Sequence, residues 1–117
     1  MPNPTNLSLD LHSLARSDAS PTETIEEVLA RIARRGDDGV WISLAPRERL
    51  LAAARAVEER RRSGAPLPLY GVPFAVKDNI DVAGLPTTAA CPAFAYTPTE
   101  DAAVVARLVA AGALPIG

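Results

Sequence analysis

Apolar side chains recur at helical spacing in several stretches of the chain, and residues that start or stop helices bound these stretches. In the clearest case Ser20 can cap the helix, a proline follows at the first helical position, and Glu23 completes a capping box. Gly36 ends this helix. The pattern predicts helices over residues 8–16, 22–35, 46–62 and 100–111, after a frayed start over residues 1–7.

Three shorter apolar runs indicate strands, over residues 40–44, 69–77 and 113–117. In the middle run Val72, Phe74 and Val76 share one face, because side chains alternate between the two sides of a strand. The last run stops at Gly117 in mid-element. We therefore expect this strand to present an open, unpaired edge, with the apolar faces of Val72 and its neighbours only partly covered.

Helices that alternate with short apolar runs predict an α/β fold. The chain has 117 residues, which is enough for one small domain with a modest core. We divide it into an N-terminal helical region, residues 1–64, and a second region, residues 65–117, which begins at a linker that contains proline.

Charge and composition exclude several classes of function. A net charge of −2 provides no basic surface for nucleic acid, and it argues against binding to an anionic membrane. The uncharged stretch over residues 82–99 is interrupted by glycine and proline, so it is not a membrane span. The sequence shows no signal peptide and has a single cysteine, so we expect a cytoplasmic protein.

Metal and nucleotide sites lack their usual residue patterns. His12 and Cys91 are the only histidine and cysteine, and they lie in separate segments, so no metal-ligand spacing exists. No glycine-rich nucleotide motif is present, and no serine lies in a GxSxG context. We interpret Cys91 as a small buried apolar residue, because no histidine is near it in sequence to activate it as a nucleophile.

Lys77 draws attention because the chain has eleven arginines and only this one lysine. Lysine can give up its proton when it is removed from water, whereas arginine cannot. Two interpretations are open. Lys77 is either a solvated lysine at a strand end, paired with Asp78 or Asp81, or a base that a buried strand delivers into a cleft.

The segment GVPFAVKDNIDVAGLPTTAACPAFAY, residues 71–96, resembles the region around the catalytic lysine of amidase-signature enzymes. The resemblance covers residues 67–117, and its most specific part is the GVPxxVKDN core. Around Ala90, Cys91 and Pro92 the sequence is most similar to allophanate hydrolases within that family. The family implies a mixed sheet covered by helices. We expect this chain to supply only the first strands of that sheet, so that the sheet is incomplete here.

The resemblance also implies a role for Lys77 as the base of a Ser–cis-Ser–Lys triad. The lysine takes a proton from the bridging serine, which activates the nucleophilic serine for attack on an amide carbonyl. In the family both serines lie in a Gly/Ser-rich region beyond the position of Gly117, so we expect a truncated, inactive chain. Asp78 and Asn79 match motif positions, and we expect them to orient the strand end and the loop by hydrogen bonds.

The leading hypothesis is therefore the lysine-bearing part of an allophanate hydrolase, which converts allophanate to ammonia and carbon dioxide. The resemblance implies no cofactor and no metal. The expected partners are a small-molecule amide, and either the rest of the enzyme or a second copy of the chain. The alternatives are another amidase, the A subunit of a tRNA-dependent amidotransferase, and a non-catalytic fragment or interaction module.

Overall fold

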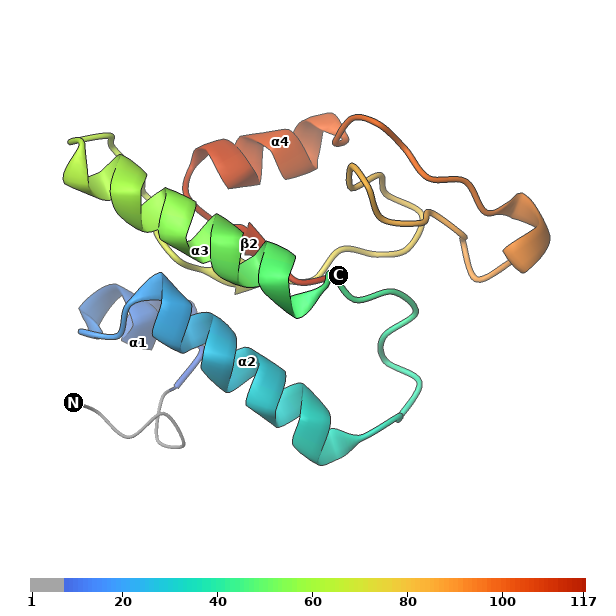
Figure 1. Ribbon diagram of the computed structural model, residues 1–117, viewed down its shortest axis with the longest axis horizontal. Coiled ribbons are helices and arrows are strands. Elements are labelled where there is room, and N and C mark those ends of the chain that lie inside the picture. The colour runs from blue at the N-terminus through green and yellow to red at the C-terminus, as the bar shows by residue number, and fades with distance from the viewer. Residues whose placement is uncertain (1–7) are drawn as a thin grey trace.

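The computed structural model describes residues 8–117, so the residues expected to be frayed, 1–7, lie outside it. The elements follow one another as α1 (Leu11–Arg16), α2 (Pro21–Arg35), α3 (Arg47–Arg62), β1 (Pro73–Phe74), the 3-10 helix η2 (Pro92–Phe94), α4 (Ala103–Ala110) and β2 (Leu114–Pro115) (Figure 1). Within the described residues the fold is thus mostly helical around a small sheet, so the predicted α/β class is confirmed only in part.

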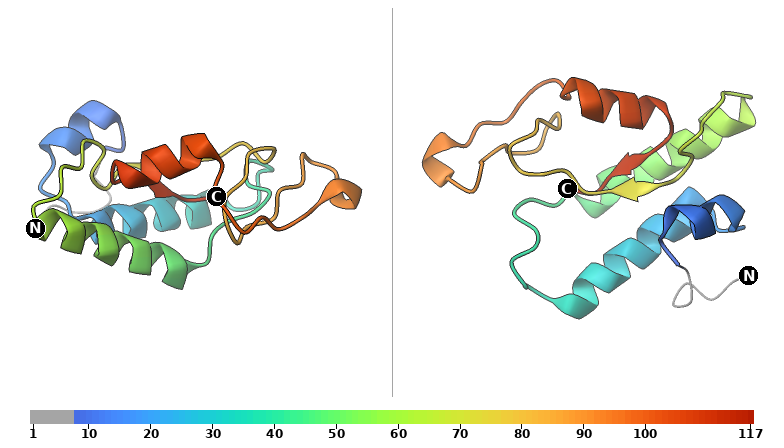
Figure 2. Two further views of the ribbon diagram at one scale, coloured as in Figure 1. Left: turned by 90° about the horizontal axis from the view of Figure 1, so that it is seen from above. Right: turned by 180° about the vertical axis from the view of Figure 1, so that it is seen from behind.

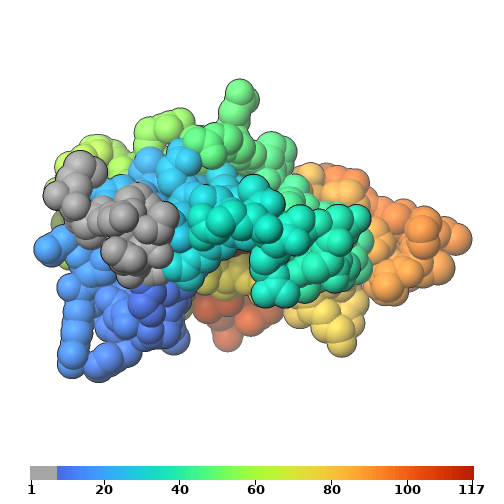
Figure 3. Space-filling view, turned by 90° about the horizontal axis from the view of Figure 1, so that it is seen from below, coloured from blue at the N-terminus to red at the C-terminus, as the bar shows by residue number. Residues whose placement is uncertain are grey.

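The helices contact different strands of the sheet. Helix α2 packs along α3 and contacts β1, while α3 and α4 both contact β2 (Figure 1). The chain between β1 and α4 leaves this body, and η2 forms a tip that stands clear of the helices (Figures 2 and 3). None of the helices within residues 8–117 has the length and apolar character needed to cross a membrane.

The two strands pair in parallel, with Pro73 opposite Leu114 and Phe74 opposite Pro115. Leu114 N–H donates to the Val72 carbonyl at 2.8 Å, and Ile116 N–H donates to the Phe74 carbonyl at 2.9 Å. Both prolines occupy positions whose N–H would point away from the partner strand, so no ladder bond is lost. The expected edge at 113–117 is therefore paired on one side, which corrects the prediction of an unpaired strand.

Hydrogen bonds continue the pairing beyond these two-residue strands. Gly71 N–H donates to the Gly112 carbonyl at 2.9 Å, and Val76 N–H donates to the Gly117 carbonyl at 2.8 Å. Most of the strand predicted over 69–77 is thus present as a hydrogen-bonded segment. The mixed sheet expected from the family resemblance is not present within residues 8–117, where both strands run in the same direction.

The strand predicted over residues 40–44 is wrong. Its alternation survives only as a burial pattern, since Val40, Ile42 and Leu44 are 64%, 56% and 40% exposed while Trp41 and Ser43 are half-buried. No strand forms there within residues 8–117: only the end of the run reaches the segment after β2, where Ala45 N–H donates to the Ile116 carbonyl at 2.9 Å, so the β-forming side chains have no ladder to join.

Helix boundaries follow the local capping residues where these are free to cap. Ser20 accepts a hydrogen bond from Glu23 N–H at 3.1 Å, and Gly36 ends α2 with a φ of 71°, as predicted. Helix α4 instead begins at Ala103, three residues later than expected, and has no side-chain cap. Asp101 accepts from Ala83 N–H at 2.8 Å, which ties this segment to the preceding loop rather than to a helix turn.

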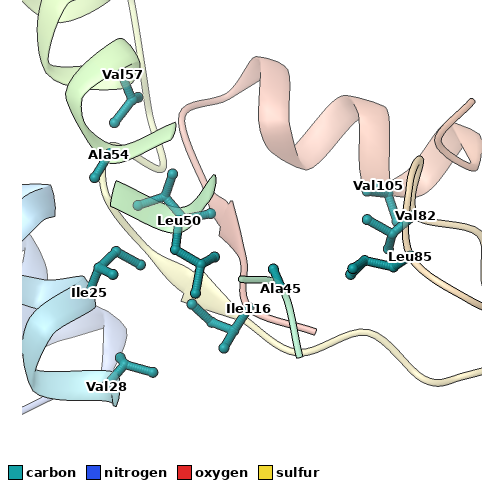
Figure 4. Close-up of a cluster of buried hydrophobic side chains, with 11 residues drawn as sticks. Ile25, Val28, Ala45, Leu50, Ala54, Val57, Val82, Leu85, Val105 and Ile116 are labelled. Carbon is teal, nitrogen blue, oxygen red and sulfur yellow. The ribbon is translucent and has the colours of Figure 1, made fainter. Parts of the chain in front are cut away.

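The buried apolar side chains form one cluster, which consists of two groups (Figure 4). Ile25, Leu50 and Ile116 gather where α2 and α3 meet β2, and Val82 and Val105 gather below α4 with Leu85. Ile25 and Leu50 are almost fully buried, so the contact between α2 and α3 is sealed from water.

Charged side chains reinforce this core at two places. The Glu27 carboxylate is buried and accepts from Arg31 at 2.8 Å and from Arg34 at 3.4 Å, and the hydrogen bond from Arg31 lowers its pKa. Between α3 and α4, Arg60 donates to the carbonyls of Val109 and Ala110. Arg60 therefore caps the negative end of α4 and joins α3 to it.

Replacing Leu50 by alanine should cost about 2–5 kcal/mol of unfolding free energy, because the side chain is 2% exposed and its loss leaves a cavity. The matched control is Leu11→Ala, at a position that is 62% exposed. Urea denaturation of both variants measures the difference. Equal losses would contradict the assignment of the core.

Candidate active site around Lys77

Lys77 lies three residues beyond β1 and lines an open pocket of about 240 Å³. Four segments build the pocket, namely residues 40–43, residues 75–78, the stretch from Ile80 to Pro86, and Gly117. Most of the side chains around it are apolar, and Lys77 is the only cation among the described residues that line it. The lysine thus follows directly after Val76, whose bond to Gly117 is the last one between the two parallel segments.

The ammonium group of Lys77 is not paired with a neighbouring carboxylate. The side chain is exposed, and within residues 8–117 the structure gives it no hydrogen bond or ion pair. The expected pairing with Asp78 or Asp81 is therefore wrong, whereas the exposure expected of a solvated lysine at a strand end is present. Both carboxylates are occupied by groups of the loop that follows.

Asp78 binds the loop through its side chain and its backbone. Its carboxylate accepts from Thr88 N–H at 3.2 Å and from the Thr88 hydroxyl. Its carbonyl accepts from the N–H groups of Thr88 at 3.1 Å and Ala89 at 3.0 Å. This is the orienting role expected for Asp78. Asn79 is exposed and makes no such bond to the described residues, so the same expectation for Asn79 is wrong.

Asp81 fastens the base of the same loop. Its carboxylate accepts from the buried Thr87 hydroxyl at 2.9 Å and from the Tyr96 hydroxyl at 2.5 Å. Thr87 and Tyr96 also exchange backbone hydrogen bonds as an antiparallel bridge. The hydrogen bond to Asp81, followed by partial burial, raises the pKa of Tyr96. These bonds close the loop between residues 81 and 96.

The loop holds two residues in an unfavourable backbone conformation. Ala89 and Ala90 have φ values of 50° and 59°, in the left-handed region that costs roughly 1–2 kcal/mol for a residue with a side chain. Ala90 N–H donates to the Thr88 hydroxyl at 3.1 Å, and Cys91 N–H donates to the Thr88 carbonyl at 2.8 Å. Thr88 therefore links the strained turn to Asp78.

The remaining candidate residues lie apart from the pocket. Cys91 is exposed near the loop tip, which corrects its interpretation as a buried residue. His12 is exposed on α1. In the described part of the chain, no group of three or more His, Cys, Asp or Glu residues is arranged to hold a metal ion. Sequence reasoning missed the partnership of Thr88 with Asp78, because nothing local indicates which donor a carboxylate will meet.

The family model for amidases matches the chain over residues 23–117. The chain therefore belongs to the amidase family. The matched residues include Lys77 and the paired segment that precedes it.

The chain is similar in sequence to several proteins of known name. The chain is 48% identical to urea amidolyase of Saccharomyces cerevisiae over 93% of its own length and 6% of the relative's. It is 44% identical to the A subunit of glutamyl-tRNA(Gln) amidotransferase from Chloroflexus aurantiacus, over 90% of its length and 22% of that protein's. The chain thus spans a small part of the relatives that it matches.

Solved structures show the same arrangement of elements. Allophanate hydrolase of Kluyveromyces lactis matches with a TM-score of 0.75 and 42% identity, over 95% of this chain and 19% of that one. Peptide amidase of Stenotrophomonas maltophilia matches with a TM-score of 0.75 and 32% identity, over 93% and 23% of the two chains. The fold is therefore that of the matching segment in amidases.

Replacing Asp81 by asparagine should lower the pKa of Tyr96 toward its ordinary value, because the negatively charged acceptor is removed. With the carboxylate present the folded chain holds the phenol proton more tightly than the unfolded chain does. This contribution to stability is full below the ordinary tyrosine pKa and is lost as the pH rises through the raised value. Ultraviolet titration of tyrosinate in a Tyr70→Phe background measures the shift. An unchanged titration would contradict the bond.

Proposed function

We propose that this chain supplies the lysine-bearing part of an amide hydrolase whose substrate is allophanate. The observation that carries the proposal is the unpaired Lys77 ammonium in an apolar pocket, at the position that matches the family's catalytic lysine. The similarity to a urea amidolyase and an allophanate hydrolase supports this substrate over other amides.

In this proposal Lys77 acts as the base. Its neutral amine accepts the proton of a bridging serine, which in turn accepts the proton of the nucleophilic serine as that oxygen attacks the amide carbonyl. The proton held by Lys77 returns through the bridging serine to the amide nitrogen, so the tetrahedral intermediate expels ammonia and leaves an acyl-enzyme, which water then hydrolyses to the acid. The Asp78 and Asp81 carboxylates accept hydrogen bonds from Thr88 and Thr87, so neither is paired with Lys77, which lines the pocket.

The similarity to a component of an amidotransferase supports a second candidate, an amidase or amidotransferase that acts on another amide. A comparison of ammonia release from allophanate, glutamine and simple amides separates the two. A non-catalytic module is the remaining alternative. A stable monomer in native size measurements, with no gain of activity on addition of other polypeptides, would favour it.

Substitution of Lys77 should abolish turnover in a chimera in which residues 1–117 replace the matching segment of the Kluyveromyces lactis allophanate hydrolase. We expect Lys77→Ala to reduce kcat by about 10³-fold or more. Lys77→Arg should fail as well, because a guanidinium does not lose its proton at neutral pH. Ammonia release from allophanate is the assay.

The matched control for this experiment is Ser43→Ala, since Ser43 lines the same pocket but has no role in the proposed reaction. It should leave kcat nearly unchanged. Thermal melting establishes that each variant is folded. Retained activity in the folded Lys77→Arg chimera would remove Lys77 from the mechanism.

The 117-residue chain by itself should release no ammonia from allophanate or simple amides. A base without the two serines leaves water as the attacking group, and loss of the nucleophile in such a coupled triad costs on the order of 10⁶ in turnover. The purified chain is assayed beside its Lys77→Ala variant. Turnover above that control would place the nucleophile within this chain and direct attention to Cys91 and its serines.

A further inference from the structure

Asp78 receives more hydrogen bonds from the loop than its role as a motif neighbour of Lys77 requires. Thr88 donates both its N–H and its hydroxyl to the Asp78 carboxylate. Thr88 and Ala89 also donate their N–H groups to the Asp78 carbonyl. One residue is therefore fixed at the backbone and at the side chain by the same short segment.

The bonds to Asp78 determine the position of two parts of the pocket. Lys77 and Asp78 share a peptide bond, so anchoring Asp78 also restricts the direction in which the Lys77 side chain leaves the backbone. Leu85 and Pro86 line the pocket and precede Thr88 by only a few residues. The same bonds therefore hold both the base and part of the wall that faces it.

The bonds also determine which groups the Asp78 carboxylate contacts. A carboxylate beside a lysine in sequence can pair with it and hold it as an ammonium ion. Here Oδ2 of Asp78 accepts from the N–H and the hydroxyl of Thr88, which are neutral donors, and the structure gives Lys77 no partner within residues 8–117. Tying Asp78 to the loop keeps the lysine available.

We propose that Asp78 is a positioning residue that acts through Thr88, orienting Lys77 and holding the Leu85–Pro86 wall of the pocket. The inference rests on the proposed function, because it assigns Asp78 a part in the reaction of Lys77. The essential property of Asp78 is an oxygen that accepts from Thr88, and its negative charge does not act on the substrate.

Kinetics of the allophanate hydrolase chimera test the proposal. Asp78→Ala and Thr88→Val should each lower kcat by roughly 10-fold to 100-fold with little change in KM, because a displaced base is a poor base even when substrate binds. Asp78→Asn and Thr88→Ser keep an acceptor or a hydroxyl and should retain most of the activity. The pH midpoint of kcat/KM should stay unchanged in Asp78→Asn.

The double variant Asp78→Ala/Thr88→Val should be no slower than the slower single variant, because both substitutions break the same contact. Additive losses, or an Asp78→Asn variant as slow as Asp78→Ala, would overturn the positioning role. Either result leaves the proposed function intact if Lys77→Ala is inactive. An active Lys77→Ala chimera would instead defeat the proposed function.

Amide hydrogen exchange in the 117-residue chain provides a measurement independent of turnover. Asp78→Ala removes the carboxylate acceptor of Thr88 N–H but keeps the backbone carbonyl that accepts from Thr88 and Ala89, so exchange should speed by about 10-fold at Thr88 and less at Ala89, while Asp78→Asn should change it little. Exchange at Ile25 and Leu50, which lie in the core away from the loop, serves as the internal control. Unchanged exchange at Thr88 in a folded Asp78→Ala chain would overturn the proposal.

Discussion

Parallel pairing of β1 with β2 is the constraint on which the rest of the molecule depends. Two parallel strands cannot be joined by a tight turn, so the chain must cross from one end of the pair back to the other. Here the crossover comprises the loop after Lys77 and helix α4. The pairing therefore fixes both ends of the segment that carries the candidate site, and Val76 N–H bonded to the Gly117 carbonyl closes it.

Within this crossover, hydrogen bonds to carboxylates hold the chain in place, as backbone hydrogen bonds do in helices and strands. Asp78, Asp81 and Asp101 each accept hydrogen bonds from loop or backbone groups several residues away. A segment rich in glycine, proline and threonine is fixed in this way without a ladder of its own. The same bonds engage the acidic groups with neutral donors, so the one lysine of the chain is left without a counter-ion among the described residues.

The sequence predicts best those features whose signals are local. Ser20 and Gly36 bound α2 as expected, because a cap acts within one helical turn. The strand at 40–44 failed since Val40 and Ile42 favour a sheet only when another strand is beside them. Lys77 was identified from its rarity and its motif. Its isolation could not be predicted, because it depends on Asp78 and Asp81 meeting threonines that lie farther along the chain.

The composition gives this pocket a natural spectroscopic probe. Trp41 is the only tryptophan of the chain, and it lines the pocket together with Lys77. Cys91 is the only cysteine, and it is exposed on the loop that leaves the body of the molecule. Emission at tryptophan wavelengths therefore comes from a single residue in the pocket wall, and a dye attached to the thiol would report the distance from that wall to the loop. No residue needs to be added or removed to make the site visible.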